Sequence, residues 1–182
     1  MSQTPFFTSD SHYFHRSILE LGDGRPFDSV EEMNEAMIQR WNERVQPNDT
    51  IYHLGDFSFG TQSQNNSVLS RLHGRKFFLW GNHDKPAKIE THWFEQIYDY
   101  KEIKVEGQHI VLFHYPVESW HSVGRGSWHL HGHCHGNLAD TPMARMDVGV
   151  DTHDFYPWSF EEIAEHMKGR VGMPSDHHQD KR

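Results

Sequence analysis

Short apolar segments, each bounded by polar or turn-forming residues, recur along most of the chain. Their length and boundaries are typical of buried β-strands rather than of helices. The sequence predicts strands at Pro5–Phe7, Thr50–Leu54, Lys76–Trp80, Ile110–Phe113, Trp128–His131 and Met146–Val150. A hairpin is also predicted, in which residues 101–105 and 109–113 pair around a turn at Glu106–Gln108.

Apolar residues with helical spacing lie between some of these strands. They recur every three or four positions between Val30 and Val45, and Ser29 with Glu32 forms a capping box in front of them. The sequence predicts three helices: one over 30–45, a shorter one that carries Val68, Leu69 and Leu72 and stops before Gly74, and one from Ser159 to about Lys168. The alternation of the two patterns predicts an α/β fold, with a mixed sheet or two sheets covered by helices.

The domain organisation follows from the length of the chain and from the absence of any repeat or linker in its sequence. A chain of 182 residues is long enough for one sizeable core, and no internal repeat or low-complexity linker interrupts it. We therefore expect one domain over residues 1–170. Residues 171–182 are polar and carry no apolar period, so we expect them to form a disordered tail.

The acidic balance of the chain limits its partners. A net charge of -9 argues against non-specific nucleic-acid binding, because binding through phosphate contacts needs a surplus of Lys and Arg. The single cysteine, Cys134, excludes an internal disulfide and fits a reducing compartment. No apolar run approaches the roughly 20 residues of a membrane helix, and no signal-peptide pattern follows Met1. The expected location is the cytoplasm, without a membrane partner.

Histidine is unusually frequent, and several histidines directly follow predicted strands. The chain has 17 His, as many as Lys and Arg together. Side chains that bind metals come after five predicted strands: Asp10, His12, Asp56, Asn82, His114, His133 and His135. Because ligands bind outside the carboxyl ends of strands in open α/β sheets, these side chains are expected to converge on one patch.

The chemistry of these seven donors points to two metal ions. They are imidazole and oxygen groups without thiolate, a set that suits Mn, Fe, Ni, Co or Zn. Seven ligands are too many for one tetrahedral ion and suit two ions that share a bridging carboxylate. Two divalent ions would make the cluster positive, attract a phosphate ester and lower the pKa of bound water to about 7. His83 is then available as a general acid, with Asp84 orienting and charging it.

The order of the motifs is more specific than any one of them. Asp-x-His, Gly-Asp, Gly-Asn-His-Asp, a lone His and Gly-His-x-His follow one another between Asp10 and His135. In this order the chain resembles the calcineurin-like metallophosphoesterase superfamily, and in its short length the small single-domain bacterial and phage members. The resemblance implies a β-sandwich of two mixed sheets flanked by helices.

The resemblance also implies a role for each motif residue. One metal ion would be bound by Asp10, His12 and His135, the other by Asn82, His114 and His133, with Asp56 bridging the two. His83 would be the catalytic acid, and Mn²⁺ is the expected metal, with Fe, Ni, Co or Zn as alternatives. Asp147 and Asp151 are candidates for orienting the ligand histidines.

The expected activity is hydrolysis of a small phosphate ester by a hydroxide that bridges the metals. A phosphodiester is favoured, because a short chain with little capping structure leaves the metals open. Candidate substrate contacts are Asn82, His83 and Arg125, the last being the one basic residue in the loop that leaves His114 and returns before Gly132. Two alternatives stay open: a broad phosphomonoesterase, and a scaffold of the same fold that binds a protein without turnover. The sequence carries no signal for an oligomeric state.

Overall fold

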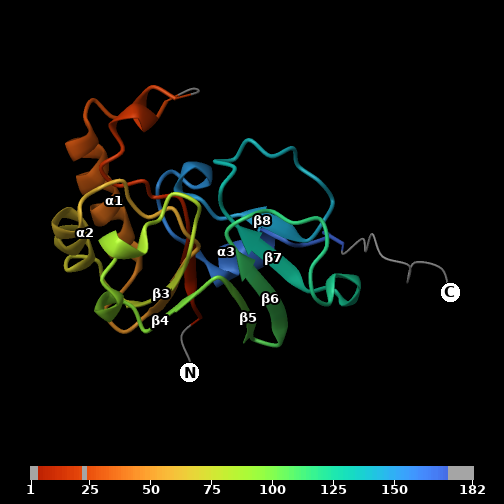
Figure 1. Cartoon of the computed structure of the whole chain (residues 1–182). Helices are drawn as coiled ribbons and strands as arrows, with labels where there is room; N and C mark the ends of the chain where they lie inside the picture. Colours follow the sequence, from red (N-terminus) through yellow and green to blue (C-terminus); the bar gives the residue numbers. More distant parts are fainter. Residues whose placement is uncertain (1–3, 22–23, 172–182) are drawn as a thin grey trace, which may run out of the picture.

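The computed structural model describes residues 4–21 and 24–171, which form two β-sheets packed against each other (Figure 1). The first sheet has the strand order β4-β3-β2-β1-β9. Its strands are β1 (Phe6–Thr8), β2 (Thr50–His53), β3 (Arg75–Leu79), β4 (Gln96–Tyr98) and β9 (Trp158–Ser159). Strands β1 to β4 pair in parallel, and β9 pairs antiparallel with β1. The sheet is therefore mixed.

The second sheet has the strand order β5-β6-β7-β8. Its strands are β5 (Tyr100–Val105), β6 (Gln108–Phe113), β7 (Trp128–His131) and β8 (Arg145–Asp147). Strands β5 and β6 form the predicted hairpin, whose turn residues Glu106 and Gly107 have φ values of 47° and 90°. Both values suit a tight hairpin turn that follows the twist of the strands. Strands β6, β7 and β8 pair in parallel, so this sheet is also mixed.

Three α-helices flank the sheets: α1 (Val30–Arg44), α2 (Gln62–Leu69) and α3 (Phe160–His166). Ser29 accepts the N–H of Glu32 at the start of α1, but the Glu32 carboxylate accepts the N–H of Asp28 rather than that of Ser29. The predicted capping box is therefore shifted by one residue on that side. At α3 both hydrogen bonds of a capping box between Ser159 and Glu162 are present.

Alternation along the strands of the first sheet divides its apolar side chains between two cores. Ile51 and Phe78 face α1 and α2, where they pack in a cluster with Met33 and Trp41. On the other face the first sheet, the second sheet and α3 share a core between the layers, made of residues such as Phe7, Leu54, Leu79, Ile110, Leu112, Leu130 and Ile163. Strands buried on both faces explain why the apolar segments of the sequence are continuous rather than alternating.

The α/β sandwich of two mixed sheets flanked by helices is confirmed. The sequence did not predict β4 or β9, which have three and two residues and too few apolar positions to form a pattern. Val171, placed at the start of the tail, pairs with Met143 in an isolated bridge. The rest of the expected disordered tail, residues 172–182, lies outside the described residues. Within the described ranges, no helix is both long and apolar enough to cross a bilayer.

Candidate metal centre

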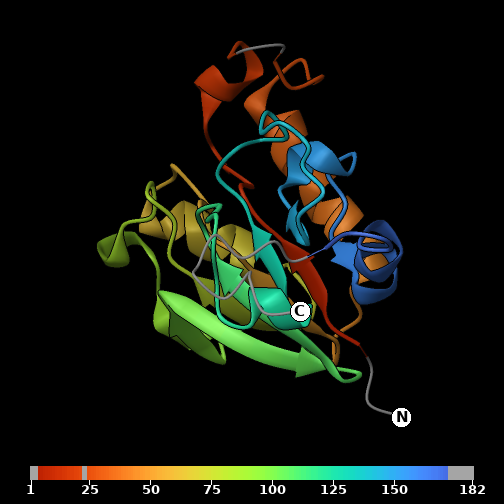
Figure 2. The same cartoon turned by 90° about the vertical axis from the view of Figure 1, so that its right-hand side faces the viewer.

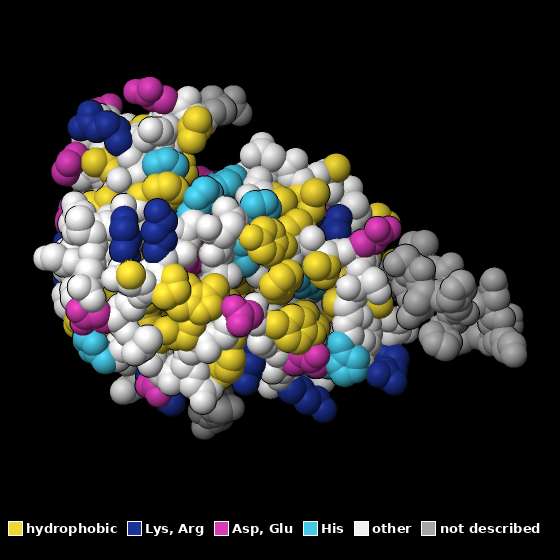
Figure 3. Space-filling view, in the orientation of Figure 1, with side chains coloured by type: hydrophobic (Ala, Val, Ile, Leu, Met, Phe, Trp, Pro, Cys, Tyr) yellow, Lys and Arg dark blue, Asp and Glu magenta, His cyan; other side chains and the backbone are white. Residues whose placement is uncertain are grey.

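All seven predicted ligand residues lie at one edge of the two sheets, where five parallel strands end. They occupy the loops that follow these strands: Asp10 and His12 after β1, Asp56 after β2, Asn82 after β3, His114 after β6, and His133 and His135 after β7. Figure 3 shows histidine side chains gathered in a hollow of the surface in the upper middle of the view. The convergence expected from the strand ends is therefore present.

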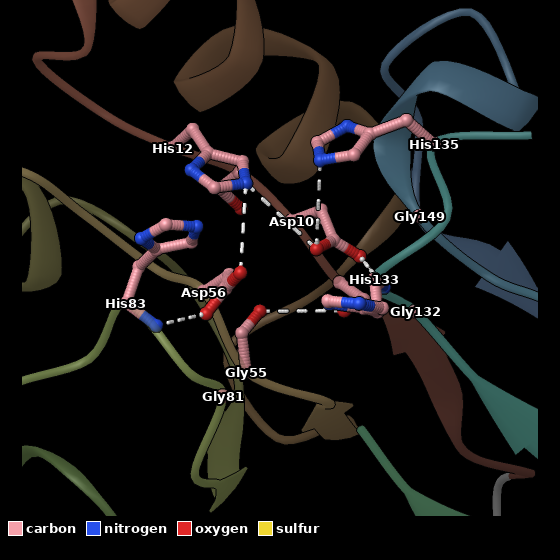
Figure 4. A network of polar contacts seen from close by, with 12 residues as sticks. Asp10, His12, Gly55, Asp56, Gly81, His83, Gly132, His133, His135 and Gly149 are labelled. Carbon is pink, nitrogen blue, oxygen red and sulfur yellow. Dashed lines mark hydrogen bonds and ion pairs between the residues drawn. The ribbon is translucent and has the colours of Figure 1, made fainter. Parts of the chain in front are cut away.

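Asp10, His12 and His135 form the first group of donor atoms (Figure 4). Their ligand atoms all lie within 4.8 Å of one another. The His12 Nε2 atom is 3.8 Å from Asp10 Oδ1, and the His135 Nε2 atom is 3.9 Å from the same oxygen. Two imidazoles thus face one carboxylate oxygen from different loops.

Asp56, His114 and His133 form the second group, and their ligand atoms also lie within 4.8 Å of one another. The side-chain oxygen of Asn82 is 2.9 Å from His114 Nε2 and 2.9 Å from His133 Nδ1. The amide oxygen of Asn82 therefore faces the same point as the two imidazole nitrogens.

Asp56 lies between the two groups. Its Oδ2 atom is 3.8 Å from His12 Nε2 in the first group and 3.5 Å from His114 Nε2 in the second. Its Oδ1 atom accepts a hydrogen bond of 2.8 Å from the backbone N–H of His83. One oxygen of Asp56 is thus directed between the groups while the other fixes the Asn82-His83 loop.

The unpaired polar atoms of the first group fit a cation. Asp10 Oδ1 and both ring nitrogens of His12 are buried and have no hydrogen-bond partner among the described residues. An unsatisfied buried polar group costs about 1–3 kcal/mol. Separations of 3.5–3.9 Å between donor atoms exceed a hydrogen bond, but suit two ligands that each lie about 2.1 Å from one ion. The residues present therefore fit a pair of divalent ions, which the nitrogen and oxygen donors also favour.

Asp56 and His12 have the protonation states that bind a cation. Burial alone would raise the pKa of Asp56, but the hydrogen bond and charge of His114, the N–H of His83 and the charge of His12 outweigh it and lower the pKa to about 2. Burial lowers the pKa of His12, which keeps its imidazole neutral. At neutral pH an ionised carboxylate and a neutral imidazole are thus available as ligands.

The backbone at the centre is strained. Five of the seven residues have φ values in the left-handed region: Asp10 at 55°, His12 at 50°, Asp56 at 57°, His133 at 71° and His135 at 49°. A non-glycine residue in this conformation costs on the order of 1–3 kcal/mol and persists only where the surrounding structure imposes it. Strain of this kind concentrates at functional sites, and here it occurs in the loops after β1, β2 and β7.

Two motif glycines provide the space for the carboxylates. A Cβ atom on Gly81 would lie 2.2 Å from Asp56 Oδ1 and 2.4 Å from the Asp56 backbone nitrogen. A Cβ atom on Gly132 would lie 2.2 Å from Asp10 Oδ2 and 2.0 Å from the Ser9 hydroxyl oxygen. At Gly81 one of these contacts is with the backbone of Asp56, and at Gly132 both are with the short side chains of Ser9 and Asp10, so a larger residue at either position would displace a predicted ligand.

Asp84 has a different role from the one expected for it. Its carboxylate accepts the backbone N–H groups of Asp56, Phe57 and Gly81 at 2.7–2.9 Å. The His83 ring instead lies against Phe59 and His12, with ring centroids 5.0 and 5.6 Å away. Burial raises the pKa of Asp84 to about 6, although the three backbone hydrogen bonds oppose this shift. Asp84 therefore joins the loops after β2 and β3, and the expectation that it orients His83 is corrected.

Arg125 is not part of the centre. It belongs to a short helical turn, η4 (Val123–Arg125), and its guanidinium donates to the Ser122 hydroxyl. It lines a hollow of about 240 Å³ together with Gly107, Gln108 and His109, at the hairpin turn. This turn precedes β6, whereas His114 follows β6. The loop that contains Arg125 thus folds back along the sheet, and the expected contact of Arg125 with phosphate oxygens is corrected.

Arg25 is a positioning residue that the sequence did not indicate. Its buried guanidinium donates to the backbone oxygens of Asp10 and Ser11 at 2.7 Å. It also forms two hydrogen bonds of 2.8 and 2.9 Å with the carboxylate of Asp151. Asp151 in turn accepts from His135 Nδ1 at 2.7 Å, which leaves His135 Nε2 directed at Asp10. The distance of 126 residues between Arg25 and Asp151 explains why no local pattern revealed this pair.

Of the two carboxylates expected to orient histidines, Asp151 therefore does so and Asp147 does not. The Asp147 carboxylate accepts the backbone N–H groups of Gly136 and Gly149 at 3.0 and 2.8 Å. Asp147 thus fixes the end of the loop that carries His133 and His135, and acts on the backbone rather than on an imidazole.

Substituting Asp151 by Asn is expected to weaken metal retention by about 10- to 100-fold, the usual effect of removing a carboxylate that supports a ligand histidine. Asn keeps the size of the side chain but loses the charge that pairs with Arg25 and His135. Metal content after dialysis against increasing chelator measures the effect. Asp154→Asn is the matched control, because Asp154 is an exposed carboxylate that pairs with Arg40 at the surface. Equal retention in the two variants would show that Asp151 does not support His135.

The chain is similar over most of its length to proteins from archaea, bacteria and phages. Residues 6–145, which contain all seven predicted ligands, match the family model of the calcineurin-like phosphoesterase superfamily domain. The uncharacterized protein MJ1445 of Methanocaldococcus jannaschii is 31% identical over 175 residues, covering 91% of this chain and 93% of that protein. The Gene 66 protein of Mycobacterium phage L5 is 30% identical, covering 83% and 87%. The crystal structure of the protein of unknown function AQ665 from Aquifex aeolicus superposes with a TM-score of 0.74 at 28% identity, covering 90% of this chain and 98% of that one.

Proposed function

The chain belongs to the calcineurin-like phosphoesterase superfamily, and from this premise we propose that it is a metal-dependent phosphodiesterase. Family membership supports hydrolysis of phosphate esters with divalent metal ions. The finer proposal is that the substrate is a diester and that manganese is the working metal. The observation that supports the diester is the exposed face of the centre, where Asn82, His83 and His133 are all open to solvent.

We assign the two donor groups to two ions. One ion would be held by Asp10, His12 and His135, the other by Asn82, His114 and His133, and Asp56 would be a ligand shared by the two. When bound, such ions supply positive charge for the phosphate oxygens and activate water as a nucleophile at neutral pH. The residues around them position the ester: the loops joined by Asp84 hold Asn82 and His83 at the open side.

His83 is the proposed general acid. Its backbone N–H is fixed on Asp56 Oδ1, so the position of the imidazole is tied to the carboxylate between the two groups. Its exposed ring lies beside Phe59 and His12 at the edge of the centre. From there the protonated ring can donate to the oxygen of the departing alcohol. Donation of this kind prevents an unfavourable alkoxide from forming.

Two features favour a diester over a monoester. A diester carries an alcohol on each side of phosphorus, and the exposure of Asn82, His83 and His133 leaves room for both. A monoester carries a second negative charge, which a guanidinium commonly pairs with through two hydrogen bonds. Arg125, the basic residue of the neighbouring loop, lies at the far end of β6 and does not supply that pairing.

A substrate and metal screen of the purified chain tests this proposal. The chain is stripped with chelator, reloaded with Mn²⁺, Ni²⁺, Zn²⁺ or Mg²⁺, and assayed on bis(p-nitrophenyl) phosphate, p-nitrophenyl phosphate and cyclic nucleotides. With Mn²⁺ we expect kcat/KM for the diester to exceed that for the monoester by at least about tenfold, or 1.4 kcal/mol. Equal or higher turnover of the monoester would make the chain a phosphomonoesterase. Bound metal without turnover of any ester would favour a protein-binding scaffold.

A further inference from the structure

We propose that Glu102, His109 and His121 form a separate binding site for one divalent transition-metal ion of the zinc, nickel and copper class. The site lies on the outer face of the second sheet, and nothing in the proposed hydrolysis requires it. His109 lies near the start of β6 and His114 directly follows its end. The five residues between these positions correspond to roughly 16 Å, because a strand rises about 3.3 Å per residue. The ion would therefore be independent of the two at the centre.

Three donor atoms converge at this site. The His109 Nε2 atom and the His121 Nδ1 atom each form a hydrogen bond of 2.8 Å with the same carboxylate oxygen, Glu102 Oε2, and a bound ion would replace the two shared protons. The ligand atoms of the three residues lie within 4.8 Å of one another, the same limit that the two groups of the centre satisfy. The rings of His109 and His121 are nearly perpendicular, with centroids 5.3 Å apart. Their nitrogens thus approach one point from two directions.

Two of the ligands are placed by the hairpin, which forms the lower edge of the molecule in Figure 2. In its register Lys104 pairs with His109 and Glu102 pairs with Val111, so Glu102 and His109 are diagonal neighbours on one face. Diagonal positions on paired strands bring long side chains within contact distance. Tyr100 donates its hydroxyl to Glu102 Oε1, which leaves Glu102 Oε2 directed at the histidines.

The third ligand is placed by a loop that is anchored on both sides. Trp120 is buried on the sheet in a cluster with Val111 and Val123, and its indole N–H donates to Ser127. The Ser127 hydroxyl donates to the backbone oxygen of His121 at 2.7 Å. The backbone at His121 is therefore fixed, while its ring is 57% exposed and accessible to an ion.

This ligand set favours a borderline transition metal. Two imidazoles and one carboxylate leave at least one position for water, as in Zn²⁺ sites with three protein ligands. Imidazole donors bind Cu²⁺, Ni²⁺ and Zn²⁺ more strongly than Mn²⁺. An ion at this site would join the hairpin to the 115–127 loop, which starts directly after His114. The 115–127 loop would then be fixed at two places: at the centre, through His114, and on the outer face of the sheet, through His121.

Zinc stoichiometry tests the proposal on the full chain. Wild type, Glu102→Gln and His121→Ala are stripped, saturated with Zn²⁺, buffer-exchanged and measured by elemental analysis. We expect the two variants to bind about one ion per chain fewer than wild type, because a site of three ligands is lost with one of them. His92→Ala is the matched control: His92 is exposed and pairs with one glutamate, Glu90, but belongs to no group of three donors among the described residues. It is expected to bind as much Zn²⁺ as wild type.

Hydrogen exchange supplies a second readout that does not depend on activity. Zn²⁺ is expected to slow exchange in residues 117–127 of wild type and not of His121→Ala. Repeating the titration in an Asp56→Asn background separates this site from the centre, because the difference of one ion should persist there. The histidines at 177 and 178 are common to all variants and cancel in the comparison. Equal Zn²⁺ binding by wild type and both site variants would overturn the proposal.

Discussion

Replacing Asp56 by Asn is expected to remove metal from both donor groups and to lower phosphodiester turnover by at least about 100-fold. Asp56 Oδ2 is the carboxylate oxygen that faces both His12 and His114, at 3.8 and 3.5 Å. Asn has a similar size, but its neutral amide is a weaker ligand and does not offset the charge of two cations. Removing a residue that only supports a ligand costs about 10- to 100-fold, so a ligand shared by two ions should cost at least the upper value.

Metal content and kcat/KM, measured on the same preparation, check this result. Asp99→Asn is the control, because it makes the same chemical change at an exposed position outside the centre. Circular dichroism should show that Asp56→Asn is folded, since the burial of an ionised carboxylate is relieved rather than created. A variant that keeps two ions and turns over diester at the wild-type rate would contradict the shared role of Asp56.

Substituting His83 by Ala is expected to slow hydrolysis in proportion to how poor the leaving group is. For an alkyl diester we expect a loss of about 10²- to 10⁴-fold in kcat, the usual contribution of a general acid. For bis(p-nitrophenyl) phosphate we expect a much smaller loss, because p-nitrophenolate leaves without a proton. The His83 side chain has no hydrogen bond to the seven predicted ligands, so metal content should stay at the wild-type value.

The dependence on the leaving group is the decisive measurement for His83. A plot of log kcat against leaving-group pKa should be steeper for the variant than for the wild-type chain. Added imidazole should restore part of the lost rate on the alkyl ester. His166→Ala, which removes an exposed histidine from α3, should change neither slope nor rate. If His83→Ala slows good and poor leaving groups equally, His83 positions the substrate and does not donate a proton.

The residues of the centre are easier to predict from the sequence than the contacts that support them. Strand ends are readable from apolar segments, and parallel strands bring their carboxyl ends to one edge of a sheet, so the pattern alone locates the seven predicted ligands. The family resemblance also assigns Asp10 and His12 to one group and Asn82 to the other. The two groups of donor atoms converge as expected.

The supporting contacts could not be predicted, for two physical reasons. Arg25 and Asp151 act on each other across 126 residues, and no local pattern encodes a contact of that range. Asp84 is adjacent to His83 in sequence, which suggested a pairing, but its carboxylate turns back to three backbone N–H groups of neighbouring loops. The 115–127 loop could not be placed either, because its path depends on where Trp120 finds an apolar surface.

The left-handed backbone of five predicted ligands creates a trade-off between the stability of the fold and metal binding. At Asp10, His12, Asp56, His133 and His135 glycine would relieve the backbone, yet only the present side chains offer donor atoms. A homologue that is no longer under selection for hydrolysis would therefore be stabilised by substitutions to glycine at these positions. Glycine at several of these positions would therefore identify, from sequence alone, a homologue that has lost its catalytic activity.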